Sequence, residues 1–122
     1  MEVVKFFFTL QHQIKLYHWQ TSVYARHIAS DTLGTGLAPL IDRFMEVLQG
    51  KLNRRVGLMN STELPLVPLD DKSIIDFLQQ SKQYLESITK LKIVRETDTD
   101  LLNIRDEMVG LMNQTLYLFS FQ

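Results

Sequence analysis

The stretch that spans residues 17–31, YHWQTSVYARHIASD, gathers side chains that can bind a metal ion or move a proton. It contains two of the three histidines in the chain, His18 and His27, and Asp31 follows His27 by four residues. Residues four apart lie next to each other on a helix, so His27 and Asp31 can reach one cation. Imidazole and carboxylate donors without thiolate suit iron, manganese or zinc.

A second pair with the same spacing, Asp42 and Glu46, follows on the same predicted helix. Each helical residue advances by about 100°, so with His27 at zero, Asp31 falls near 40°, Asp42 near 60° and Glu46 near 100°. The four polar residues therefore share one side of the helix. A polar side opposite an apolar side is also what any amphipathic helix shows, so a metal site and a solvated face both remain open.

His18 differs from these residues because it shares a helical face with apolar side chains, namely Val4, Phe7 and Ile14. It is therefore predicted to point inward, either as a hydrogen-bonded core residue or as a metal ligand. If the chain turns near Thr21, His18 and His27 lie about equally far from the turn and face each other across a helical hairpin. His12 has no acidic neighbour at useful spacing and is interpreted as structural or exposed.

Apolar residues at helical spacing predict four helices that position these side chains. The first two are expected over residues 2–20 and 24–58, followed by a proline-containing loop over residues 60–71. The third is capped by Asp70 or Asp71 and runs to about Leu91, and the RETDTD segment (residues 95–100) breaks it and caps the fourth. The pattern predicts an all-α protein, an antiparallel four-helix bundle, with residues 1–122 as a single domain.

The inward positions follow from the same spacing. In the second helix they are Leu33, Leu37, Leu40, Ile41, Phe44, Val47 and Leu48. In the third they are Ile74, Leu78, Leu85 and Ile88. In the fourth they are Leu101, Ile104, Met108, Leu111, Thr115 and Leu118.

The boundary between the first two helices is ambiguous from local propensity. Gly34, Gly36 and Pro39 would lie inside the second helix, where each glycine costs about 1 kcal/mol relative to alanine and a proline about 3 kcal/mol. The chain could break there, or it could break near residues 20–23, where Thr21 or Ser22 can cap a helix.

Composition narrows the class of protein. The chain has 122 residues, a net charge of -1 and no cysteine, which excludes disulfides and thiolate metal sites. No signal peptide or membrane span is expected, so a cytoplasmic protein without membrane partners is predicted. The basic cluster at residues 51–55 is interpreted as complementing the end of a helix dipole, and DNA binding is not expected.

The order His18-Trp19, then His27-x3-Asp31, then Asp42-x3-Glu46 resembles the Dps mini-ferritins. The resemblance implies a ferritin-like four-helix bundle whose metal ligands would be His18, His27, Asp31, Asp42 and Glu46. The second half of the chain contains no histidine, as in that family and unlike classical ferritins. It also implies that the first helix break lies near residues 20–23.

The function that the resemblance implies is oxidation and sequestration of Fe(II), a ferroxidase-type activity, with zinc or manganese as alternative metals. The resemblance implies a di-metal site between subunits, with two irons. Asp31 and Asp42 are separated by about 16 Å along one helix, so either there are two half-sites or a partner chain supplies the other half. A homo-oligomer is therefore expected, a dimer at least, and by resemblance a dodecameric cage. Trp19 is interpreted either as a neighbour of the site that quenches radicals or as a core aromatic.

The chain also departs from the family pattern. The spacing from His18 to His27 is shorter than usual by roughly one helical turn, which puts contact between His18 and the site in question. There is no lysine-rich tail. The variant is similar to small Dps-like proteins of phages and large DNA viruses. The alternative function is therefore a non-enzymatic structural or assembly protein, for instance a virion component, with a vestigial metal site.

Overall fold

The computed structural model describes residues 1–58, 60 and 62–121. Within these residues the chain forms four α-helices and one 3-10 turn, without any strand. The elements are α1 (Val3–Gln20), α2 (Tyr24–Leu52), α3 (Ser73–Glu86), η1 (Ile88–Leu91) and α4 (Thr99–Phe119). The predicted all-α class is confirmed. No helix in the described part of the chain is long and apolar enough to cross a membrane.

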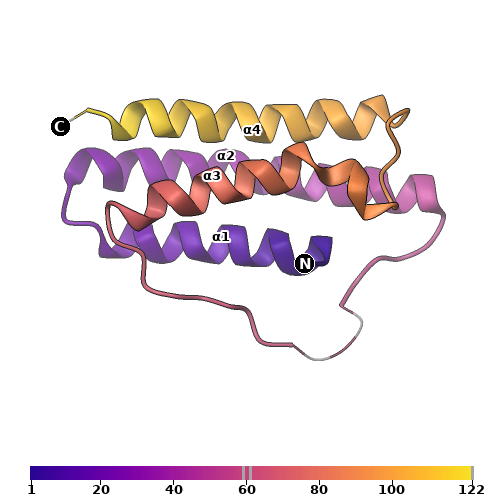
Figure 1. Ribbon diagram of the computed structural model, residues 1–122, viewed down its shortest axis with the longest axis horizontal. Helices are drawn as coiled ribbons and strands as arrows, with labels where there is room; N and C mark the ends of the chain where they lie inside the picture. The colour runs from indigo at the N-terminus through magenta and orange to yellow at the C-terminus, as the bar shows by residue number, and fades with distance from the viewer. Residues whose placement is uncertain (59, 61, 122) are drawn as a thin grey trace.

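The helices form two antiparallel pairs joined by a long connection (Figure 1). α1 runs antiparallel to α2, and α3 runs antiparallel to α4. Residues 53–72 lead the chain back along the molecule, so α2 and α3 point in the same direction. α2 packs against both α1 and α4, and α4 packs against α3, which leaves α1 and α3 facing each other on the remaining side. The arrangement is bundle-like.

The core confirms most of the predicted inward positions. Leu33, Leu37, Ile41, Phe44 and Leu48 of α2 are buried, and Leu40 and Val47 pack beside them. All four positions predicted for the third segment, Ile74, Leu78, Leu85 and Ile88, are buried. In α4 two predicted positions were off by one residue: Met112 and Phe119 are buried in place of Leu111 and Leu118. The reason is that a straight helix drifts relative to an alternating three- and four-residue repeat.

α2 continues through Gly34, Gly36 and Pro39 without a break. The chain instead turns at residues 21–23, as the resemblance implied. A break after Leu33 would take Leu37 and Ile41 off the buried face. Burying large apolar side chains contributes about 1.5–3 kcal/mol each, so Leu37 and Ile41 together roughly offset the local cost of the two glycines and the proline.

Two predicted helix limits and one predicted helix cap were wrong. α2 ends at Leu52 rather than at Leu58, because Asn53 adopts a left-handed conformation that stops the helix. The third helix ends at Glu86, and its predicted last turn is the separate 3-10 turn η1. Asp98 stands at the start of α4 but does not cap it, because its carboxylate accepts a hydrogen bond from the Arg95 amide at 2.8 Å.

The connection over residues 53–72 is held against α1 by a buried glutamine. The Gln13 side chain donates to the Val67 carbonyl at 2.9 Å and accepts from the Val67 amide at 2.7 Å. A side-chain amide thereby satisfies both backbone groups of one extended residue, as a neighbouring strand would. Residues 60–71 were predicted as a loop, and their described part is one; Ser61 lies outside the described residues.

Candidate metal centre

The hairpin between α1 and α2 brings His18 and His27 together. The ring centroids are 4.0 Å apart and the ring planes differ by 14°. His18 lies in the last turn of α1 and His27 in the first turn of α2. The short spacing between them therefore does not keep His18 away from its partner, because the tight turn at residues 21–23 folds one helix end directly onto the other.

Each histidine is fixed by the backbone of the other. His18 Nδ1 lies 2.8 Å from the His27 carbonyl oxygen, and His27 Nδ1 lies 2.8 Å from the His18 carbonyl oxygen. A carbonyl can only accept, so each Nδ1 carries the proton and donates it. In the neutral ring this leaves Nε2 with a free lone pair. Metal-binding histidines are oriented in the same way, by a hydrogen bond from the nitrogen that does not face the metal.

The His27 ring also stabilises the end of α1. The last carbonyls of a helix have no partner within the helix, and His18 contributes one of them. Ser30 adds a second polar contact, because its hydroxyl donates to the His27 carbonyl at 3.1 Å and lies 3.4 Å from His18 Nδ1. The pair is therefore held in place before any ligand arrives.

Asp31 lies beside the histidine pair. Its Oδ1 atom is 3.9 Å from His18 Nε2, and its side chain is 55% exposed. His18, Ser30 and Asp31 line a shallow pocket between α1 and α2. The free nitrogen of His18 and the carboxylate of Asp31 are thus available on the same open side of the hairpin.

Asp42 and Glu46 are exposed on a later part of α2. The helix rise of about 1.5 Å per residue keeps them far from His27 and Asp31 within one chain. Across the described ranges 1–58, 60 and 62–121, no three His, Asp or Glu side chains gather closely enough to hold a metal ion. Within one chain, the described residues therefore form no complete metal site.

The stacked geometry limits what the two imidazoles can bind together. A metal ion lies about 2.1 Å from a histidine nitrogen and close to the plane of the ring. Because the two planes are nearly parallel, one ion cannot lie in both at that distance. In this arrangement His18 and His27 can serve two different ions.

Comparison with known proteins gives a family without a described activity. Residues 18–119 match the model of DUF5856, whose description is a family of unknown function. The chain belongs to the DUF5856 family. The match begins at His18, so it covers both stacked histidines and all of α2, α3 and α4. No curated protein and no solved structure matches the chain significantly.

Trp19 is not a core residue in this DUF5856 protein. Its side chain is 68% exposed, so the interpretation as a core aromatic was wrong. Tyr24 and Ile28, in the first turns of α2, are also exposed. His12 is exposed and lies near Phe8, with ring centroids 6.4 Å apart, as expected for a histidine outside the site.

A second polar cluster near the hairpin was missed from the sequence. The buried Tyr17 hydroxyl donates to Asp71 Oδ1 at 2.6 Å, and the Thr21 hydroxyl donates to the same oxygen at 2.9 Å. Arg26 donates to the Asp71 carbonyl and to the Phe119 carbonyl. The sequence feature that could have revealed this cluster is the pair of adjacent aspartates, Asp70 and Asp71. Asp70 alone accepts hydrogen bonds from the backbone amides at the start of α3, so Asp71 is available for another partner.

This cluster shifts two pKa values in opposite directions. Burial raises the pKa of Tyr17, and its hydrogen bond to the Asp71 carboxylate adds to the rise. The hydrogen bond from Tyr17 holds the pKa of Asp71 below its ordinary value, with help from Thr21 and the charge of Arg26. At neutral pH the Tyr17 phenol is therefore protonated and the Asp71 carboxylate is ionised. This is the state in which Tyr17 can donate its hydrogen bond to Asp71.

The basic cluster at residues 51–55 is partly neutralised. Lys51 Nζ lies 3.4 Å from Asp98 Oδ1 and 3.2 Å from Asp100 Oδ1. The carboxylates stabilise the ammonium, and the pKa of Lys51 is raised chiefly by its hydrogen bond to Asp100. The contacts tie the end of α2 to the start of α4, which is a structural role for this lysine.

Proposed function

We propose that this protein binds Fe(II) as a substrate at a ferritin-like metal centre of the Dps type, shared between two copies of the chain. His18, His27 and Asp31 of one copy and Asp42 and Glu46 of the other would hold two ions, with the two imidazoles on different ions. The bound Fe(II) would give electrons to dioxygen or peroxide, and the Fe(III) would be sequestered. Zinc or manganese suits the same nitrogen and oxygen donors.

One observation carries this proposal, namely the reciprocal hydrogen bonds from each Nδ1 to the opposite carbonyl. They orient both rings and leave both Nε2 atoms free for a ligand. The carboxylate of Asp31 lies 3.9 Å from His18 Nε2. Packing of the hairpin by the two histidines does not require this carboxylate, whereas a metal site uses it as a further ligand.

The helix arrangement supports the same proposal. Two antiparallel pairs joined by one long crossover are the connection pattern of ferritin-like four-helix bundles. In the proposed dimer a twofold axis sets the α2 helices antiparallel, so that His27 and Asp31 of one copy face Asp42 and Glu46 of the other. Exposed Ile28 beside the polar residues would then be covered. The dimer would be the minimum unit, with a dodecameric cage built from it in the cytoplasm.

A second candidate function is a structural or assembly module without catalysis, for instance in a virion. The observation that favours it is the set of exposed aromatics at the end of the molecule where α1 and α4 finish and α2 begins (Figure 1). These aromatics are Trp19, Tyr24, Tyr117 and Phe121. Exposed aromatic groups are typical of binding surfaces.

The test is calorimetric titration of the purified protein with Fe(II) under anaerobic conditions and with Zn(II). The wild type should bind both, and Asp31→Ala and His27→Ala should each lose most of the binding. His12→Ala is the matched control, since it removes the exposed histidine outside the site. Identical titrations of wild type and Asp31→Ala would reject the metal centre, and absence of metal together with binding to a larger assembly would favour the second candidate.

A further inference from the structure

A groove lies at the end of the molecule opposite the histidine pair. Three segments meet there, namely the start of α1, residues 54–58 after α2, and residues 91 and 93 near η1 (Figure 1). The groove has a volume of about 400 Å³. His27 and Asn53 stand near opposite ends of α2, so at about 1.5 Å per residue they are roughly 40 Å apart. The groove is therefore separate from the candidate metal centre.

The walls of this groove are aliphatic. They are formed by branched apolar side chains from all three segments: Val3, Val4, Val56, Leu58, Leu91 and Ile93. Leu58 is 44% exposed, so part of this apolar surface is open to solvent. Covering such surface with another apolar group is favourable. The groove can therefore take up a branched aliphatic side chain.

The segment that carries the two arginines of the groove is held in a fixed turn at the end of α2. Asn53 ends the helix in a left-handed conformation, with φ of 53°. The Val56 amide then donates to Gln49 Oε1 at 2.9 Å, and the Val56 side chain packs against the core. Arg54 and Arg55 therefore stand between two anchored residues.

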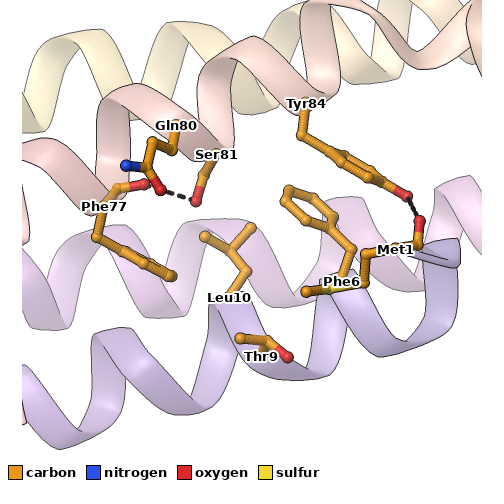
Figure 2. A pocket seen from close by; sticks show the side chains of 8 residues that line it. All are labelled: Met1, Phe6, Thr9, Leu10, Phe77, Gln80, Ser81 and Tyr84. Atoms are coloured by element: carbon orange, nitrogen blue, oxygen red, sulfur yellow. Dashed lines mark hydrogen bonds between the residues drawn. The ribbon is translucent and has the colours of Figure 1, made fainter. Parts of the chain in front are cut away.

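The start of α1, on the other side of the groove, is held to α3. The Tyr84 hydroxyl donates to the Met1 carbonyl at 2.8 Å (Figure 2). Burial and the nearby charge of Glu2 raise the pKa of Tyr84 to about 12, so the hydroxyl keeps its proton. Glu2 also lines the groove, but within the described residues its carboxylate makes no ion pair with either arginine.

Arg54 and Arg55 are the positive groups at the edge of the groove. Both side chains belong to exposed residues, and among the residues that the structure describes neither guanidinium has a hydrogen bond or an ion pair. Lys51, one turn earlier, is instead paired with Asp98 and Asp100. The contacts that neutralise this lysine do not extend to the two arginines, which are therefore available to an anionic partner.

We propose that this groove binds an acidic peptide segment of a partner protein. One branched apolar side chain of the segment lies between the aliphatic walls, and the flanking carboxylates pair with Arg54 and Arg55. A guanidinium holds a carboxylate through two parallel hydrogen bonds. Opposite charges across an interface also speed association and select the partner.

The groove fits an acidic peptide better than it fits a nucleic acid. Proteins that bind single strands stack the bases on aromatic side chains, and within the described residues no aromatic ring lines this groove. Non-specific binding to nucleic acid also depends on several phosphate contacts. The two arginines offer few such contacts, whereas the aliphatic walls suit a protein side chain.

The test uses two fluorescein-labelled peptides of equal charge, Glu-Glu-Leu-Glu-Glu and Glu-Glu-Ser-Glu-Glu, and a single-stranded thymidine oligonucleotide. Fluorescence anisotropy follows the binding of each probe to the full chain at low ionic strength. The leucine peptide should bind about tenfold more tightly than the serine peptide, because only leucine removes apolar surface from water. Its binding should weaken as salt is added, since ions screen exposed charges.

A variant that carries both Arg54→Gln and Arg55→Gln should bind the leucine peptide about tenfold more weakly than the wild type. The matched control carries Arg43→Gln and Lys72→Gln, which remove the same charge from exposed positions outside the groove, and it should bind like the wild type. Circular dichroism checks that both variants are folded.

Three results would overturn the proposal: absence of peptide binding, equal affinity of the wild type for the two peptides, or equal losses in the two variants. Tighter binding of the oligonucleotide than of the leucine peptide would also overturn it, in favour of a nucleic acid. If the arginine variant fails to fold, the comparison of the probes on the wild type decides by itself. None of these measurements contains a metal ion, so the outcome is independent of the candidate metal centre.

Discussion

Tyr17 and Asp71 show how single residues join distant parts of this chain. Tyr17 is 1% exposed and lies in α1, and Asp71 lies just before α3. Their 2.6 Å hydrogen bond and the contacts of Arg26 link the hairpin, the long connection and the end of α4. Arg26 also stacks over the Phe119 ring, 4.8 Å from its centroid. A second set of residues, apart from the histidine pair, therefore also holds the hairpin.

Replacement of this phenol gives a prediction on acid stability. The pKa of Asp71 is lowered in the folded protein, chiefly by Tyr17, below its unfolded value of about 3.9. The stabilisation from Asp71 is therefore present above that pH and is lost as pH falls through the folded pKa. Tyr17→Phe should reduce stability at neutral pH by about 1 kcal/mol and make unfolding less sensitive to acid between about pH 4 and the folded pKa.

The measurement is urea unfolding followed by circular dichroism over a series of pH values from neutral to strongly acidic. Tyr117→Phe is the control, because Tyr117 is an exposed tyrosine of α4. Equal loss of stability in both variants at every pH would contradict a specific role for the Tyr17 hydrogen bond.

At the scale of the element, α2 shows how packing overrides local propensity. Gly34 and Gly36 both lie in the middle of this helix, but their surroundings differ. A Cβ atom at Gly34 would meet Ile14 Cγ2 at 3.8 Å, an ordinary contact. A Cβ atom at Gly36 would approach Leu111 Cδ1 to 3.0 Å, so α4 packs closely here. Gly36 therefore serves the contact between α2 and α4, whereas Gly34 meets no such constraint.

The two glycines predict different effects of the same substitution. Gly34→Ala should stabilise the protein by about 0.5–1 kcal/mol, because alanine loses less conformational freedom in a helix than glycine. Gly36→Ala should give a smaller gain or a loss, because the new methyl group must displace the Leu111 side chain. Urea midpoints of the two variants measure the difference, and a Gly36→Ala protein more stable than Gly34→Ala would disprove the close approach of α4.

At the scale of the whole molecule, the proposed metal centre depends on a second chain. His27→Ala and Glu46→Ala homodimers should each be inactive in iron oxidation. In a mixed dimer one shared site carries both changes and the other carries none. Random mixing makes roughly half of the dimers mixed, so about a quarter of all sites should recover. The measurement is the oxidation rate after the two inactive variants are refolded together.

Exchange between the chains is checked by native mass. Recovery towards a quarter of the wild-type rate would support the shared site. Absence of recovery in a sample that contains mixed dimers would mean that the ligands act within one chain or that they do not act at all. A monodisperse monomer at micromolar concentration would argue against the dimer itself.

The sequence by itself determined the helical class and most buried positions, because spacing at the helical period identifies the side that must leave water. It also determined that His18 and His27 could meet, since both lie equally far from a turn. Their stacking and carbonyl hydrogen bonds needed the tertiary structure. Local propensity also left the continuity of α2 past Pro39 open, although the resemblance implied it. These features depend on contacts between segments that are separate in the chain, and local propensity contains no information about such contacts.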